Sequence, residues 1–113
     1  MAALDRVSAW APVVLWAAMI FVLSSIPDLS TGLGTWDTLV RKVLHAVEFA
    51  ILGALCLRAL GRPLAAGILA SGYAALDELH QSFVEGRMGS PLDWAIDTLG
   101  VIVGILVLLA TTR

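Results

Sequence analysis

Four long hydrophobic segments make up most of the chain, and only the first is free of charge over the thickness of a bilayer. Residues 7–27 carry no charged side chain, and a membrane-spanning helix needs about 20 mostly apolar residues. A soluble domain of 113 residues has too little interior for this composition, in which 59% of residues are hydrophobic and 14% are charged. The composition therefore predicts a membrane protein.

Ionisable residues interrupt the three later segments. His45 and Glu48 lie within the second, and the uncharged runs of the third and fourth cover only residues 63–76 and 98–112. At about 1.5 Å per residue such runs span roughly 21 to 23 Å, less than the ~30 Å of hydrocarbon, so each helix must include polar turns. We predict one all-α domain over residues 1–113, a polytopic bundle of four transmembrane helices at about 7–27, 36–60, 63–84 and 92–112.

The sequence gives less support to a signal peptide, to nucleic-acid binding and to a reactive cysteine. Arg6 precedes the first segment, so a secretory signal peptide is the alternative there, but the run is long for one and no small-residue cleavage site follows it. The net charge of -2, without a Lys/Arg-rich stretch, gives no basis for nucleic-acid binding. Cys56 is the only cysteine, which excludes an intrachain disulfide, and its apolar surroundings favour a packing role.

The basic residues predict the orientation, because short cytoplasmic loops are enriched in Lys and Arg. Cytoplasmic N- and C-termini place four basic residues inside and three outside, namely Arg6, Arg58, Arg62 and Arg113 against Arg41, Lys42 and Arg87. No acid adjoins the two arginines around the shortest connection. The opposite loops and helix ends contain the acids Asp28, Asp37, Glu85 and Asp93.

Three titratable residues lie at similar depth in this arrangement. His45, Asp77 and Asp97 stand 13 to 16 residues from the basic residue at the cytoplasmic end of their helices. Helical rise places them roughly 20 to 24 Å above the inner boundary. We expect them to meet in one layer in the outer half, with Glu48 nearer the midplane. His80, Gln81, Arg87 and Asp93 are expected closer to the outer surface.

Each of the last three helices carries one polar stripe at helical spacing. The stripes are Arg41, His45 and Glu48; Asp77, His80, Gln81 and Val84; and Asp93, Asp97, Gly100 and Gly104. A charge that faces lipid costs at least a few kcal/mol, so we expect these stripes to face one another or a watery cavity. Gly100 and Gly104 form a G-x-x-x-G motif that allows close helix packing.

Acids outnumber fixed cations in the outer half. If the acids of the first loop are left out, the outer half contains six carboxylates, namely Glu48, Asp77, Glu78, Glu85, Asp93 and Asp97. It contains three permanent cations, Arg41, Lys42 and Arg87, and two histidines, His45 and His80. Protonated carboxyls, charged histidines, a bound metal or a cationic ligand could compensate. The alternative is that the basic and imidazole groups pair with acids and brace the bundle.

A divalent metal is an open cofactor alternative. Asp77 and His80 form a single i, i+3 pair, and the H-E-x-x-H spacing of zinc proteases is missing. Ligands from His45 or Asp97 would have to complete a site.

Several motifs together resemble the signature of the VanZ-like membrane proteins over nearly the whole chain. They are Lys42-x-x-His45-x-x-x-Phe49, Asp77-Glu78-Leu79-His80-Gln81-Ser82-Phe83, Gly86-Arg87, and Asp93 followed by Asp97 and Gly100. The resemblance implies a bacterial plasma-membrane protein of a family named for an accessory factor of glycopeptide resistance, associated with lowered susceptibility to teicoplanin. Glu85 and Asp97 stand where proline and asparagine are frequent in that family.

Three functions follow as hypotheses. The first is a membrane-embedded enzyme or binder for an outer-leaflet amphiphile, either a lipid or a lipid-linked envelope precursor. Lys42 and Arg87 would hold an anionic head group. His45, Asp77, His80 and Asp97 would supply acid-base groups or metal ligands, with Glu48, Glu78, Gln81 and Asp93 as further binding residues.

The second hypothesis is a non-catalytic protein that binds a glycopeptide or wall component or assembles with other membrane proteins. A homodimer could complete the cavity of so thin a bundle. Cation or proton transport is the third and least supported, because the polar residues occupy only one half of the membrane thickness.

Overall fold

The computed structural model of the chain describes residues 3–25, 35–84 and 91–111, with side chains from residue 5 in the first range and residue 39 in the second. These ranges contain four α-helices and no β-strand. The all-α class and the four predicted helices are therefore confirmed. The helices are α1 (Ala3–Ser24), α2 (Thr35–Leu60), α3 (Pro63–Gln81) and α4 (Pro91–Thr111).

Two helices end earlier than the sequence predicted. α1 ends at Ser24, and residues 26 and 27 of the predicted first helix lie outside the described residues. α3 ends at Gln81 rather than Val84, because the next three amides donate to carbonyl oxygens three residues earlier, over 3.0 to 3.2 Å. Such tight turns are common at helix C-termini.

The short connection between α2 and α3 contains two residues that favour a reversal of chain direction, Gly61 and Pro63. Gly61 has a φ of 71°, which a residue without a Cβ adopts at little cost. Pro63 occupies the first turn of α3, where its missing N–H would have no partner within the helix. The two helices therefore leave this turn as antiparallel neighbours.

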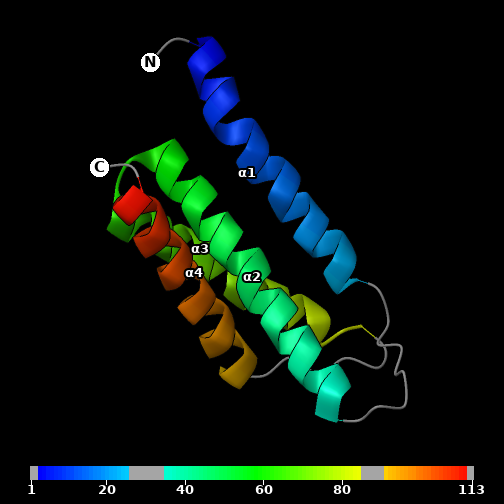
Figure 1. Cartoon of the computed structure of the whole chain (residues 1–113). Coiled ribbons are helices and arrows are strands. Elements are labelled where there is room, and N and C mark those ends of the chain that lie inside the picture. The colour runs from blue at the N-terminus through cyan, green and yellow to red at the C-terminus, as the bar shows by residue number, and fades with distance from the viewer. Residues whose placement is uncertain (1–2, 26–34, 85–90, 112–113) are drawn as a thin grey trace.

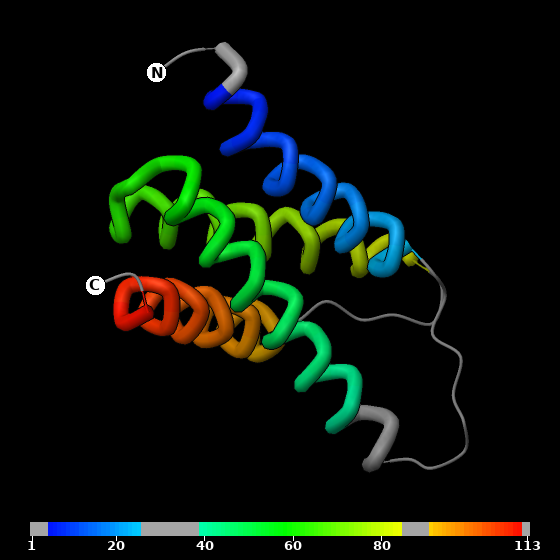
Figure 2. The backbone as a smooth tube through the Cα atoms, turned by 45° about the horizontal axis from the view of Figure 1, so that its top comes forward, coloured from blue at the N-terminus to red at the C-terminus, as the bar shows by residue number. Residues whose placement is uncertain are grey.

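α2 and α3 lie between α1 on one side and α4 on the other (Figure 1, Figure 2). Among the described residues α1 packs against α2 and α3 but not against α4. Two side chains tie α1 to its neighbours, since Tyr73 donates to the carbonyl of Ala17 at 2.6 Å and Trp16 donates to the carbonyl of Glu48 at 2.9 Å. The first turn of α1, the last turn of α4 and the α2–α3 connection lie at one end of the bundle (Figure 1).

The closest helix pair is α2 with α4, and glycine makes the approach possible. A Cβ on Gly100 would overlap the backbone of Ala46, and one on Gly104 would overlap the backbone of Ala50. The close packing predicted from the G-x-x-x-G motif is confirmed. Gly53 supports the same contact from α2, because its Cβ would lie 2.8 Å from the carbonyl oxygen of Val101.

Three helices are long and apolar enough to cross a membrane, through Asp5–Ser24, Leu39–Leu60 and Pro91–Thr111. Among the described residues α3 does not meet that criterion, because its final turns contain several polar side chains. The apolar core lies between the helices and includes Cys56, as its apolar surroundings predicted. The other fully enclosed members include Ile20, Phe49, Leu52, Ala66, Ala70, Ala74 and Val101.

Candidate functional site

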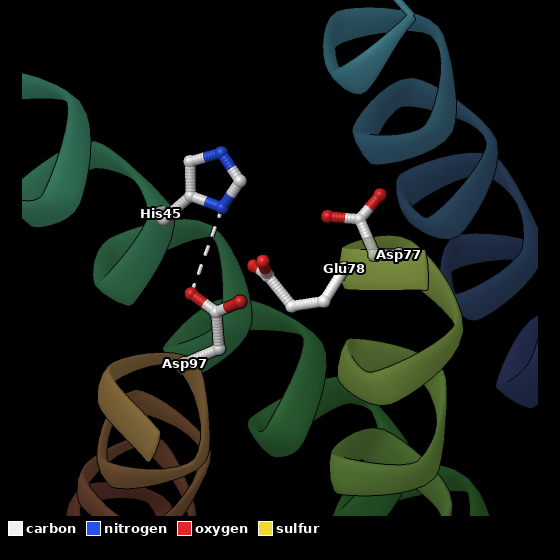
Figure 3. A group of neighbouring side chains, drawn as sticks. All are labelled: His45, Asp77, Glu78 and Asp97. Atoms are coloured by element: carbon white, nitrogen blue, oxygen red, sulfur yellow. Dashed lines mark ion pairs between the residues drawn. The ribbon is translucent and has the colours of Figure 1, made fainter. Parts of the chain in front are cut away.

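Four ionisable side chains from three helices converge inside the bundle. His45 comes from α2, Asp77 and Glu78 from α3, and Asp97 from α4 (Figure 3). One nitrogen or oxygen atom from each lies within 4.8 Å of those of the other three. We call these four residues the polar cluster. The predicted meeting of His45, Asp77 and Asp97 in one layer agrees with this arrangement.

The glycines of α4 position Asp97 against His45. Asp97 lies three residues before Gly100, on the same face of α4, so the close approach to α2 carries its side chain towards that helix. His45 lies one turn before Phe49, which is fully buried. The Nδ1 atom of His45 is 3.6 Å from Oδ1 of Asp97, an ion-pair distance if the imidazole is protonated.

α3 contributes two carboxylates to the cluster. The predicted stripe on this helix contained Asp77, His80 and Gln81, whereas the buried polar side chains are Asp77, Glu78 and Gln81. Neighbouring helices on two sides make the buried face of α3 wider than one stripe. Glu78, which we expected only as a further binding residue, therefore reaches the space between α3, α2 and α4 (Figure 3).

Gln81 links the cluster to α1. Its Nε2 atom lies 3.1 Å from Oδ2 of Asp77, 3.3 Å from Oγ of Ser24 and 3.4 Å from Nε2 of His45. One amide nitrogen thus contacts side chains of α1 and α2 as well as its own helix. Ser24 is almost completely buried, which places this contact in the interior of the protein.

Several carboxylate oxygens of the cluster are buried without a hydrogen-bond donor. Asp97 is 1% exposed and Asp77 is 2% exposed. In the part of the chain that the structure describes, neither oxygen of Asp97 accepts a hydrogen bond, and neither does Oδ1 of Asp77. Burial of an ionised carboxylate is costly unless it is paired or binds a metal. These atoms are therefore the part of the cluster best suited to a ligand.

His80 lies outside the cluster, on the side of α3 that faces α1. Its Nε2 atom is 2.8 Å from Oγ of Ser25, and its ring stacks on Phe21 with centroids 4.3 Å apart. Oγ of Ser25 is also hydrogen-bonded to the carbonyl of Phe21. We assigned His80 to the same site as His45, but the structure places the two imidazoles in different surroundings.

The remaining predicted residues surround the cluster or fall outside the structure. Lys42 donates to Oδ1 of Asp93 in an ion pair between α2 and α4, and both side chains are partly exposed. Arg41 and Glu48 are partly buried on α2 and do not belong to the cluster. Arg87, the predicted partner of an anionic head group, lies outside the described residues.

A known protein family matches nearly the whole chain. Residues 6–112 match VanZ/LLP1. The chain belongs to the VanZ/LLP1 family. The resemblance inferred from the motifs around His45, Asp77 and Asp97 is thereby confirmed. No curated protein and no solved structure shows a significant match to the chain.

Family membership and three long apolar helices together identify a multi-pass membrane protein of the VanZ/LLP1 family with a buried His/Asp/Glu cluster. A role in resistance to glycopeptides such as teicoplanin rests on the family name alone. Fold and family do not define a substrate, which has to be argued from the site.

Proposed function

We propose that this VanZ/LLP1 protein spans a bacterial plasma membrane four times and uses the polar cluster to bind and process an outer-leaflet amphiphile. The ligand class is a lipid or lipid-linked envelope precursor with an anionic head group. The observation that carries the proposal is the convergence of four ionisable side chains from three helices inside a largely lipid-facing bundle. Ionisable groups at membrane depth are expensive and mark functional sites by default.

A membrane-spanning α3 is supported by the division of its surface. Leu64, Ile68, Leu76 and Leu79 are exposed on the outside of the bundle, whereas Asp77 and Glu78 face inwards. The low hydropathy of α3 therefore arises from side chains that would not meet lipid. With 19 residues the helix has a length of about 28 Å, close to the hydrocarbon thickness.

Cytoplasmic termini are supported by the basic residues at one end of the bundle. Arg6, Arg58 and Arg62 belong to the end that contains the termini and the α2–α3 connection, and all three are exposed. Basic residues near short connections favour the cytoplasmic side. The polar cluster is nearer the other end, five residues or fewer from the end of α3, and would then lie beneath the outer surface.

Access for a head group is supported by the partly exposed pair Lys42 and Asp93. Their side chains are 32% and 27% exposed, in contrast to the enclosed cluster. An ammonium in this position can exchange its carboxylate partner for a phosphate without first leaving a buried site. His45, Asp77 and Asp97 would then supply acid-base groups close to the bound head group.

Non-catalytic binding of a glycopeptide or wall component is the second candidate. It is supported by the contacts of Gln81, because a cluster held by cross-links between helices can act as a rigid receptor without chemistry. Proton or cation transport has less support. The core on the side of the termini is built from apolar residues such as Cys56, Leu57, Ala66 and Ile105.

The test is native mass spectrometry of the full chain released from bacterial membranes. Wild-type protein is expected to retain an anionic amphiphile, and Lys42→Ala and Asp97→Asn are expected to lose it. Ser71→Ala is the matched control, because it removes a polar contact between α3 and α4 outside the cluster, the hydrogen bond with Thr98 at 3.1 Å. Equal retention by all variants would contradict the proposal.

Incubation of the reconstituted protein with the retained amphiphile then separates the two candidates. A chemically altered head group that depends on Asp77 and Asp97 supports catalysis. Retention of an unchanged ligand supports binding alone. Glycopeptide added to the same vesicles tests the antibiotic-binding alternative directly.

A further inference from the structure

We infer that His45, Asp77, Glu78 and Asp97 form a site for one divalent transition-metal ion of the class of Zn²⁺ or Mn²⁺. The inference deepens the proposed function and rests on it, because the ion would serve the same head-group site. It is drawn from the geometry, the burial and the donor chemistry of the four side chains.

The geometry suits one ion. Metal–ligand bonds of about 2.1 Å place neighbouring ligand atoms roughly 3.0 to 3.4 Å apart in octahedral or tetrahedral coordination. The 3.6 Å between Nδ1 of His45 and Oδ1 of Asp97 is already close to that separation. The remaining pairs lie within 4.8 Å, and rotation about the side-chain bonds of Glu78 and Asp77 can shorten them.

Buried acceptor atoms provide a second, independent observation. Both carboxylate oxygens of Asp97 and Oδ1 of Asp77 are enclosed, and within the described residues no donor hydrogen-bonds to them. The close-up shows the Asp97 carboxylate directed towards His45 and Glu78 (Figure 3). Oδ1 of Asp97 already faces Nδ1 of His45 at 3.6 Å, and a metal ion would supply a positive partner to the other enclosed oxygens as well.

The charge of the cluster also favours a divalent ion. Three carboxylates and one imidazole occupy it, so full ionisation with a neutral histidine leaves three negative charges in an enclosed space. Lys42 is engaged by Asp93. A divalent ion bound to the cluster would offset two of the three charges.

The donor types indicate which ions fit. Carboxylate oxygens alone would suit Mg²⁺ or Ca²⁺, but an imidazole nitrogen among them shifts the preference towards Zn²⁺, Mn²⁺ or Fe²⁺. Nε2 of His45 lies 3.4 Å from Nε2 of Gln81, which leaves Nδ1 as the ring nitrogen directed towards Asp97 and towards a bound ion.

The experiment is a titration of the full chain in lipid nanodiscs after treatment with EDTA, using MnCl₂ and ZnCl₂ as probes. Loss of the free Mn²⁺ signal in electron paramagnetic resonance measures binding, and Zn²⁺ is added as a competitor. We expect saturation at one ion per chain. Failure of both ions to saturate the wild-type protein would overturn the inference.

A matched pair of variants locates the ion. Asp97→Asn removes one charge from the cluster, and Asp5→Asn makes the same chemical change at an exposed position near the N-terminal end of α1. We expect Asp97→Asn to weaken Mn²⁺ binding by at least tenfold and Asp5→Asn to leave it unchanged. Equal affinities for the two variants would overturn the assignment.

Paramagnetic broadening keeps the test decisive if Asp97→Asn fails to fold. In wild-type protein, Mn²⁺ should selectively broaden the nuclear magnetic resonance signals of His45 and the backbone around Asp77 and Asp97. Broadening confined to the exposed ends of the helices would overturn the inference. Lipid retention by EDTA-treated protein is measured in parallel. Retention of the amphiphile without metal binding would overturn the metal site alone, and metal binding without retention of the amphiphile would overturn the proposed function alone.

Discussion

Gln81 is the residue whose contacts are hardest to satisfy together. Its amide nitrogen has three side-chain neighbours within 3.4 Å, on α1, α2 and α3. A primary amide carries two N–H groups, so at most two of these neighbours receive a hydrogen bond at one time. The contact of Gln81 with His45 therefore competes with its contacts to Asp77 and Ser24.

We predict that Gln81→Leu destabilises the protein by about 1 to 3 kcal/mol, because buried polar atoms lose their donor. Unfolding by sodium dodecyl sulfate, followed by circular dichroism, measures the change. Ser71→Ala is the control, and we expect it to cost ~0.6 kcal/mol, the average for a hydrogen bond between membrane helices. A Gln81→Leu variant as stable as Ser71→Ala would show that the amide does not organise the cluster.

Single residues also show where sequence reasoning reached its limit. His45, Asp77 and Asp97 could be placed at one depth because helical rise and the ends of the hydrophobic segments determine depth. Glu78 could not be assigned to the cluster from spacing, because it lies about 100° from Asp77 around α3. Its burial depends on which helices flank α3, and that arrangement is tertiary.

At the scale of the helices, the contact of α2 with α4 depends on glycine. The G-x-x-x-G motif predicted a close neighbour but could not identify it, because any helix with small residues can fit against such a face. The structure identifies the neighbour as α2, with Ala46 and Ala50 opposite Gly100 and Gly104. The close approach that these small residues allow brings Nδ1 of His45 on α2 to 3.6 Å from Oδ1 of Asp97 on α4.

Gly104→Ala is therefore predicted to destabilise the protein by about 1 to 3 kcal/mol or more, the usual cost of overpacking, because the new Cβ overlaps the backbone of Ala50. Thermal unfolding in detergent provides the measurement. Gly72→Ala is the matched control on α3, since a Cβ there meets nothing within 4 Å. We expect the control to change stability by less than ~0.5 kcal/mol. Similar losses at both positions would argue against glycine-dependent packing.

For the whole molecule, the membrane topology depends on α3, the one helix among the described residues that does not meet the length and hydropathy criterion for a span. Its sequence is too polar to satisfy a hydropathy criterion, yet its apolar residues face outwards and its acids face inwards. Hydropathy averages over all faces of a helix, so it underestimates a span whose polar side is covered by protein. A helix whose polar side is covered by protein can be distinguished from a polar surface helix only by the burial of its side chains, which requires the fold.

Cysteine labelling at the two ends of α3 tests this topology. In a Cys56→Ala background, Pro63→Cys is predicted to react with an impermeant maleimide only after the cells are opened. Ser82→Cys is predicted to react in intact cells. Both positions are exposed, so access to the thiol depends on the side of the membrane. Labelling of both positions from the same side would exclude a membrane-spanning α3.

The central claim is that side chains from α2, α3 and α4 meet in one enclosed cluster. Nuclear Overhauser effects between side-chain protons of the full chain in lipid bicelles test it most directly. We predict cross-peaks from the His45 ring to Asp97 and Glu78, with cross-peaks between Phe49 and Tyr73, whose ring centroids are 6.3 Å apart, as the internal control. Presence of the control cross-peaks without any from His45 to Asp97 or Glu78 would contradict the claim.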